Sequence, residues 1–181
     1  MPPLVSPPFG VPGAGSSEVL ELSWELFGEL CRVLALRVAR DYQPEIIIGI
    51  AKAGVIPAAT IASILRADLY TMKISRRSGG ELVSEQPQVL TAAPVQAAGR
   101  RVLVVDEISS SGDTLRLALA AVRSVGPADV RTATAFARPG GFRPDYHALE
   151  TDALIVFPWD RKVLEDGELV VHPAYRGVVE A

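Results

Sequence analysis

Apolar residues fall along this chain in two alternating patterns, short continuous runs and helical stripes. Residues 46–50 (Ile-Ile-Ile-Gly-Ile) and 102–105 (Val-Leu-Val-Val) are continuous runs that are rich in β-branched side chains. Such runs are typical of strands that are buried on both faces of a parallel sheet. We predict further strands over residues 69–74, 130–137 and 153–157.

Three segments between these runs have helical spacing of their apolar positions. The first covers residues 24–42 and is preceded by Ser23, which we predict to be its N-cap. The second covers residues 55–65, and the third covers residues 114–125. Gly126 follows the third segment, and glycine is the residue type preferred just beyond a helix C-terminus.

Strands that alternate with helices predict an α/β fold, a mainly parallel, twisted sheet with helices on both faces. Residues 1–17 are rich in Pro, Gly and Ser, and we expect them to form a flexible N-terminal tail. The length of 181 residues fits one domain, which we assign to residues 18–181. Residues 75–98 have little periodicity, and we expect an irregular excursion there.

Charge and cysteine content exclude several classes of protein. The formal net charge is −3 and the sequence pI is about 5.4, so we expect no nucleic acid as a partner. A single cysteine, Cys31, excludes an internal disulfide framework and a cysteine-rich zinc cluster. Residues 46–65 are mostly apolar, but Lys52 would cost roughly 2.5–3.5 kcal/mol within a bilayer. We therefore expect no membrane partner and a cytoplasmic location.

The strongest chemical signal follows the run at residues 102–105. Two adjacent acids, Asp106 and Glu107, end this predicted strand, and a loop of serines and glycine leads into the next helix. Ligands of open α/β sheets bind at the carboxyl ends of strands, and N–H groups at a helix start suit a phosphate. The acids suit ribose hydroxyl groups or a hydrated Mg²⁺. Taken by its residue type alone, Asp113 is expected to be a helix cap.

This stretch resembles the phosphoribosyl-pyrophosphate motif of the type I phosphoribosyltransferases, in which apolar strand residues and two acids precede Thr-Gly-x-Thr. The resemblance implies that family's α/β fold, with a small hood and a flexible loop. It also implies that Asp106 and Glu107 contact the ribose hydroxyls. The 5′-phosphate would be bound by the loop, namely Ser110, Ser111, Gly112, Asp113 and Thr114.

Residues 48–54 resemble the pyrophosphate loop of the same family. Lys52 would supply the charge that faces the diphosphate, and the backbone of Ala51, Ala53 and Gly54 would complete the loop. The family usually has Gly where this chain has Ala53. By residue type alone, Lys52 is a surface lysine on a strand–helix turn. With Asp106 and Glu107, it is the implied catalytic set.

A third resemblance, to the 6-oxopurine branch of the family, concerns the nucleobase. Arg138 stands where that branch has a Lys that meets the purine 6-oxygen. By residue type alone, Arg138 is equally well a surface cation. Leu154 would pack on the base, whereas Ile155 and Asp160 would read its other edge. Trp159 is expected to pack in the core.

The resemblance implies an enzyme that transfers ribose 5-phosphate from phosphoribosyl pyrophosphate to a purine base, with guanine, xanthine or hypoxanthine favoured. It implies Mg²⁺ as cofactor, release of pyrophosphate, and a homodimer or homotetramer. Residues 75–90, with Ser75, Arg76 and Arg77, would form a lid that excludes water.

Other functions stay open at this point because Ser110 stands where the 6-oxopurine enzymes usually have an Asp. Adenine and orotate enzymes lack that Asp, so a transferase for adenine or another base is one alternative. A non-catalytic sensor of phosphoribosyl pyrophosphate is a second. A flavodoxin-like nucleotide-binding protein is a third, but it leaves the acid pair unexplained.

Overall fold

The computed structural model describes residues 18–75, 77–78, 81–82 and 86–179. The expected tail, residues 1–17, and Arg76 of the expected lid lie outside the described residues. The chain divides into two compact units. We call Gly28–Thr151 the sheet unit, and we call the described residues before and after it the terminal unit. The single domain expected over residues 18–181 stays a prediction.

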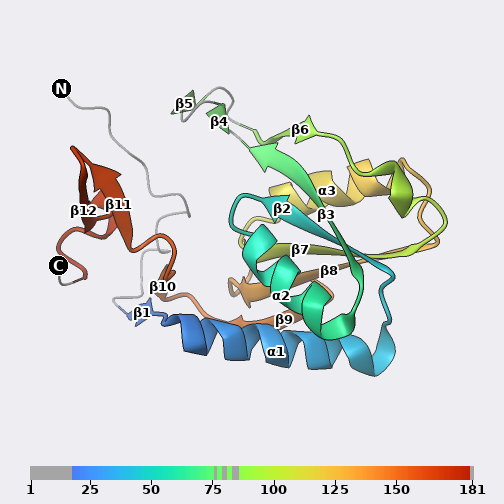
Figure 1. Cartoon of the computed structure of the whole chain (residues 1–181), viewed down its shortest axis with the longest axis horizontal. Helices are drawn as coiled ribbons and strands as arrows, with labels where there is room; N and C mark the ends of the chain where they lie inside the picture. Colours follow the sequence, from blue (N-terminus) through green and yellow to red (C-terminus); the bar gives the residue numbers. More distant parts are fainter. Residues whose placement is uncertain (1–17, 76, 79–80, 83–85, 180–181) are drawn as a thin grey trace. The chain divides into compact units, whose positions relative to one another are not determined.

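A six-stranded sheet forms the sheet unit, with strand order β6-β3-β2-β7-β8-β9 (Figure 1). All neighbouring strands are parallel except β6, which pairs antiparallel with β3. The strands are β2 (Ile46–Ala51), β3 (Asp68–Ser75), β6 (Gln88–Thr91), β7 (Arg101–Ser109), β8 (Asp129–Ala137) and β9 (Tyr146–Glu150). The short strands β4 (Arg77–Ser78) and β5 (Glu81–Leu82) pair with each other, and η1 (Val95–Ala97) follows β6.

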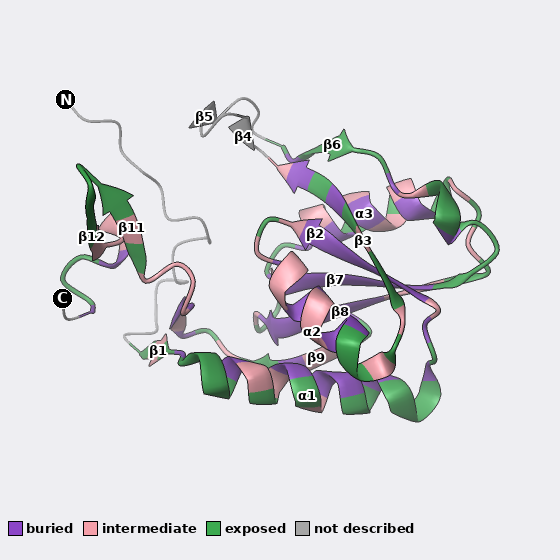
Figure 2. Cartoon of the chain, in the orientation of Figure 1, coloured by how far each residue is buried: buried purple, intermediate pink, exposed green. Residues whose placement is uncertain are grey.

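Helices cover both faces of this sheet, as predicted. Helices α1 (Trp24–Asp41) and α2 (Val55–Leu65) pack on one face, where Leu34, Ile61 and Leu103 share a core cluster. Helix α3 (Asp113–Arg123) packs on the other face. Strands β2 and β7 are buried over most of their length, whereas the outer surface of α1 is exposed (Figure 2). None of the described helices combines the length and apolar character needed to cross a bilayer.

The predicted strands and helices are confirmed, but two expectations were wrong. We expected an irregular excursion within residues 75–98, but Gln88–Thr91 forms an edge strand, β6, whose register with β3 shifts between Lys73 and Ile74. All four of its residues are exposed, so no alternation of apolar and polar positions marks it. In addition, β7 does not end at Asp106 and Glu107 but continues to Ser109, because β8 pairs with it as far as Ala137.

The terminal unit joins the two ends of the described chain. Strand β1 (Val19–Glu21) pairs parallel with β10 (Leu154–Val156), and β11 (Lys162–Glu165) pairs antiparallel with β12 (Glu168–Val171). The 3-10 helix η2 (Pro173–Tyr175) follows β12. The Oγ of Ser23 accepts a hydrogen bond from Leu26 N at 3.1 Å, which confirms the predicted N-cap of α1.

Candidate active site

Three loops meet at the carboxyl edge of the sheet, because they follow three neighbouring parallel strands. Strand β7 lies between β2 and β8. Residues 51–54 follow β2, and residues 110–112 follow β7. Arg138 follows β8, and its N–H donates to Ser109 O at 2.8 Å. The structure therefore brings together the predicted pyrophosphate loop, the acid pair with its phosphate loop, and Arg138.

The acid pair is almost fully buried, at 8% exposure for Asp106 and 8% for Glu107. The Oδ1 of Asp106 accepts a hydrogen bond from Glu107 N at 3.0 Å. Burial raises the pKa of Asp106 well above its usual range, and the neighbouring Glu107 raises it further. Hydroxyl groups of a ligand would replace the hydrogen bonds to water that these buried carboxyls have lost.

The turn after β2 passes very close to the acid pair. A Cβ on Gly54 would lie 2.7 Å from Oδ1 of Asp106, so only glycine fits there. The peptide bond between Ala51 and Lys52 is cis. Lys52 is exposed and pairs with no other described residue. The turn therefore presents one cation and its backbone beside buried carboxyls.

The phosphate loop enters α3 through a left-handed glycine. Gly112 has φ +83° and occupies the N-cap position, so the expectation that Asp113 caps the helix was wrong. Asp113 instead is the first helical residue, and its Oδ2 accepts from Ser111 Oγ at 2.8 Å. The first N–H groups of the helix have no acceptor within it, which suits an anion. Thr114 belongs to this first turn.

The segment after β8 supports the phosphate loop, which the sequence analysis missed. Phe142 N donates to Ser110 O at 2.9 Å, and Ser109 Oγ donates to Phe142 O at 2.7 Å. A Cβ on Gly141 would lie 2.2 Å from Ser110 O. The pair Gly140-Gly141 directly after a strand was the one available signal, since it marks a close backbone approach.

Arg138 has structural partners that its residue type did not reveal. Its Nη1 donates to Thr151 O at 3.1 Å, and its side chain is partly buried. Because one N–H is held by a backbone carbonyl, the guanidinium has a defined position at the sheet edge.

The other predicted base-binding residues belong to the terminal unit. Leu154 and Ile155 lie in β10, where Leu154 N donates to Glu18 O. Asp160 accepts a hydrogen bond from Tyr175 Oη at 3.1 Å. Burial and the Asp160 charge raise the pKa of Tyr175 above its usual range.

Trp159 packs within an aromatic cluster of the same unit, although it is partly buried and not part of the fully buried core. Its ring stacks on Phe157, with 4.6 Å between the ring centroids, and meets Phe27 edge-on at 4.8 Å. Trp24 lies beside it, with the centroids 5.8 Å apart. These contacts fix the chain directly before Asp160.

Among the described residues, no group of three or more His, Cys, Asp or Glu side chains is placed to hold a metal ion. A divalent cation beside Asp106 and Glu107 would therefore take most of its ligands from water or from the oxygens of a bound substrate.

Comparisons with known proteins agree with this arrangement. The family described as phosphoribosyl transferase domain matches residues 22–166. A xanthine-guanine phosphoribosyltransferase of Nitratidesulfovibrio vulgaris is 32% identical over 161 residues, which cover 86% of this chain and 93% of that protein. One from Cereibacter sphaeroides is 32% identical over 77% of this chain and 85% of its own length. The crystal structure of a purine phosphoribosyltransferase from Pyrococcus horikoshii Ot3 superposes with a TM-score of 0.71 and 28% identity, covering 83% and 99% of the two chains.

Proposed function

This chain belongs to the phosphoribosyltransferase family, and from that premise we propose that its acceptor is a 6-oxopurine of the guanine, xanthine or hypoxanthine type. The chain is an enzyme that transfers ribose 5-phosphate from phosphoribosyl pyrophosphate to a purine base. The observation that carries the assignment of the site is the buried pair Asp106 and Glu107, set between a phosphate loop and the turn that bears Lys52.

The reaction breaks the bond between ribose C1 and the diphosphate, and it forms a bond between C1 and a purine nitrogen, whose proton passes to the solvent. Positive charge develops on the ribose and negative charge on the leaving diphosphate. We assign to Asp106 and Glu107 the ribose hydroxyls, where their charge favours the developing cation. Lys52 and the backbone of residues 51–54 stabilise the leaving diphosphate.

The 5′-phosphate is assigned to residues 110–114. Its partners are the N–H groups at the start of α3 and the hydroxyls of Ser110, Ser111 and Thr114. By fixing the phosphate end, this loop holds C1 at the acid pair, and such positioning is a large part of catalysis in group transfer.

Base recognition is assigned to Arg138, Leu154, Ile155 and Asp160. A guanidinium suits the 6-oxygen that guanine, xanthine and hypoxanthine share, whereas adenine carries a donor there. The names of the 32% identical relatives support the same class of base. Ser110 replaces the Asp expected from the 6-oxopurine branch, so we assign to the loop no side chain that takes the base proton.

We propose Mg²⁺ as the cofactor. It would be bound with the diphosphate and the ribose hydroxyls, beside Asp106 and Glu107, where it would neutralise the charge of the leaving group. The two buried acids fit this arrangement, in which the substrate supplies most of the ligands.

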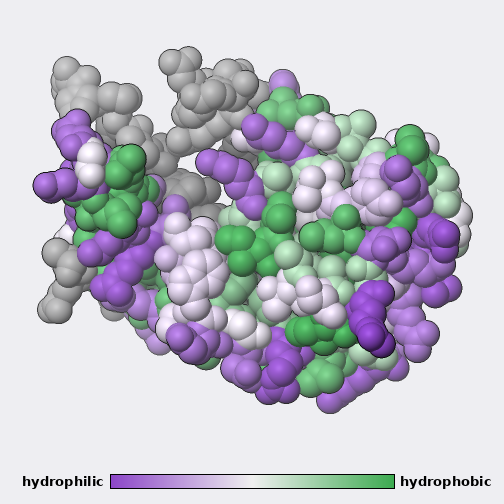
Figure 3. All heavy atoms as spheres, in the orientation of Figure 1, coloured by the Kyte–Doolittle hydropathy of each residue, from purple (hydrophilic) through white to green (hydrophobic). Residues whose placement is uncertain are grey.

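We also propose a cytoplasmic homo-oligomer, a dimer or tetramer. Helix α2 supports this because it contains no charged residue. Its residue Ile64 is nevertheless 43% exposed, and Leu69, nearby in the sequence, is 40% exposed. Figure 3 shows hydrophobic and near-neutral residues over α2, with hydrophilic residues around them. Thr60 and Ser63 are the polar residues of this helix, and an uncharged surface with an exposed isoleucine is suited to a contact with another protein chain.

The test is release of pyrophosphate from phosphoribosyl pyrophosphate and Mg²⁺, with guanine, xanthine, hypoxanthine and adenine supplied one at a time. We expect release with a 6-oxopurine and its loss in the double variant Asp106→Asn, Glu107→Gln. Release with adenine alone would overturn the base assignment. Binding of the sugar diphosphate without release for any base would overturn catalysis by this site.

A further inference from the structure

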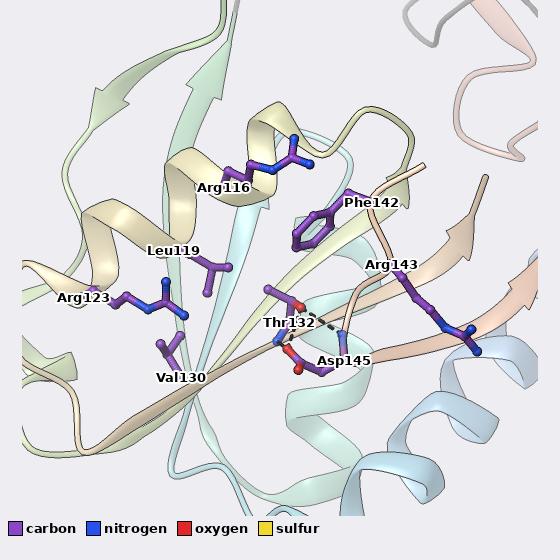
Figure 4. A pocket seen from close by; sticks show the side chains of 8 residues that line it. All are labelled: Arg116, Leu119, Arg123, Val130, Thr132, Phe142, Arg143 and Asp145. Carbon is purple, nitrogen blue, oxygen red and sulfur yellow. Dashed lines mark hydrogen bonds between the residues drawn. The ribbon is translucent and has the colours of Figure 1, made fainter. Parts of the chain in front are cut away.

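A pocket of about 370 Å³ lies in the sheet unit, between α3 and the connection from β8 to β9 (Figure 4). This volume falls at the lower end of the range of small-molecule sites, roughly 300–1,000 Å³. None of the residues assigned above to the substrates lines it. The lining residues are Arg116, Leu119, Arg123, Val130, Thr132, Phe142, Arg143 and Asp145.

The pocket combines an apolar wall with guanidinium groups. Arg116, Leu119 and Arg123 follow one another at i, i+3 and i+7 on α3, so they share one face of the helix. Figure 4 shows Leu119 between the two arginines, with Phe142 across the pocket from them. Arg143 belongs to the β8–β9 connection at the edge of the pocket, and Figure 4 shows its side chain pointing away from Leu119 and Arg123. An apolar wall with arginines at its rim is suited to a ligand that has both an apolar body and a negative charge.

The guanidinium groups differ in how far they are already paired. Arg116 donates to Ser111 O at 2.7 Å and lies 5.0 Å from the centre of the Phe142 ring. Arg123 and Arg143 make no hydrogen bond or ion pair with any other residue that the structure describes. These two cations are therefore available to a ligand.

The acid in the lining is already used by its neighbours. The Oδ2 of Asp145 accepts hydrogen bonds from Thr132 N at 2.7 Å and from Thr132 Oγ1 at 2.8 Å. The lining contains three arginines and this single carboxylate, although the whole chain carries a net charge of −3. The pocket is therefore locally positive in a chain with a negative net charge, and such a local charge is typical of an anion-binding site.

We propose that this pocket is a second ligand site, for a small organic anion that consists of one apolar ring and a phosphate or carboxylate group. The ring lies against Leu119, Val130 and Phe142, and the anionic group pairs with Arg123, which lies beside Leu119 and Val130 (Figure 4). Arginine suits this role because its planar fork of donors matches the oxygens of both groups.

Occupancy of the pocket acts on the phosphate loop, and this part of the inference rests on the proposed function. Phe142 forms one wall and also supports the loop, since its N–H and C=O bond Ser110 and Ser109. A Cβ on Gly112 would lie 2.1 Å from Cβ of Phe142, so the Phe142 side chain packs directly against the backbone of the loop. A ligand that shifts Phe142 or Arg116 therefore changes the affinity for the 5′-phosphate.

The test uses phenyl phosphate as the probe, with isothermal calorimetry on the whole chain. Binding is measured with and without saturating ribose 5-phosphate, which occupies the phosphate loop. We expect binding to persist with ribose 5-phosphate and to weaken about tenfold in Arg123→Gln, the loss of one charged hydrogen bond. Arg66→Gln is the matched control, since Arg66 is an exposed arginine just after α2 that does not line the pocket.

A second variant, Leu119→Trp, fills the pocket without removing charge. We expect it to abolish binding of the probe while turnover in its absence stays as in the parent chain. In the parent chain alone, the probe should change KM for phosphoribosyl pyrophosphate. Displacement by ribose 5-phosphate, equal binding in Arg123→Gln, or no binding at all would each overturn the second site. Binding in the pocket without an effect on KM would overturn only the coupling.

Discussion

Gly54 and Asp106 approach each other so closely that a methyl group has no room between them. A Cβ at position 54 would lie 2.7 Å from Oδ1 and 2.8 Å from Cα of Asp106, and 2.7 Å from Ile50 O. Two of these three atoms belong to the backbone, so no side-chain rotation relieves the contact. The spacing between the turn after β2 and the acid pair therefore depends on this glycine.

We expect Gly54→Ala to displace the turn and to lower kcat/KM for phosphoribosyl pyrophosphate about a hundredfold, because misplacement by about 1 Å has that effect on positioned groups. Steady-state kinetics at varied substrate concentration measure this. Gly28→Ala is the control, since Gly28 lies inside α1 with open space around it. That variant should keep its activity and gain about 0.5–1 kcal/mol of stability. Equal activity in both variants would contradict the expectation.

Asp106→Asn should raise stability at neutral pH while it lowers kcat by on the order of 10². The folded state raises the pKa of this carboxyl above its usual value of 3.8, so it binds the proton more tightly than the unfolded chain does. The stability of the parent chain therefore falls as pH rises from about 3.8 through the folded pKa. Above that pKa the full free-energy cost of burying the ionised carboxylate is present. Asparagine carries no such penalty.

Thermal unfolding in EDTA, without substrate, measures this difference across pH. We expect the gain in Tm from Asp106→Asn to be absent in acid and present at neutral pH, at ~2–4 °C for each kcal/mol. Asp68→Asn, at an exposed aspartate, provides the comparison and should show no such trend. A gain that does not depend on pH would mean that the charge is not its source.

Asp113→Asn should lower KM for phosphoribosyl pyrophosphate by about twofold to fivefold and leave kcat unchanged. The carboxylate holds the hydroxyl of Ser111 and repels an incoming phosphate, at a cost similar to other charge effects at a helix end, about 0.3–1 kcal/mol. The same variant should lose a few tenths of a kcal/mol in stability, because an acid in the first turn stabilises α3. A higher KM would show that Asp113 supports the loop through Ser111.

Ile64→Lys should dissociate the proposed oligomer, since it puts a charge on the uncharged surface of α2. Sedimentation velocity of the parent chain and the variant at equal concentration measures the change. Leu164→Lys is the control, because Leu164 is 73% exposed on β11 and tests whether any apolar surface residue has the same effect. Identical sedimentation of the parent chain and Ile64→Lys would remove α2 from the interface.

The core of the sheet was predictable because its signals are local. The run at residues 46–50 and the helix over 55–65 match β2 and α2 closely. Continuous burial and helical spacing are both recognised from the residue types of a few consecutive positions. Strand β9 and the short β1 were missed because edge and short strands carry few buried positions.

Within the candidate site, the acid pair and the phosphate loop were found because they form one continuous motif. The contact between Phe142 and Gly112 was not, because it joins residues 30 positions apart and leaves no periodic pattern. The misjudged cap at Asp113 has a similar cause, since the left-handed φ of Gly112 depends on that packing.

The division of the chain into two units sets an order for its folding during synthesis. The sheet unit is one continuous stretch, Gly28–Thr151, whereas the terminal unit needs β1 from the start of the described chain and β10 from near its end. On the ribosome, the sheet unit is therefore complete before β10, the partner of β1, has been made. The segment with Leu154 and Asp160 folds last, so a chain that stops after Thr151 retains the proposed site for phosphoribosyl pyrophosphate together with Arg138, and it lacks the other residues proposed for the base.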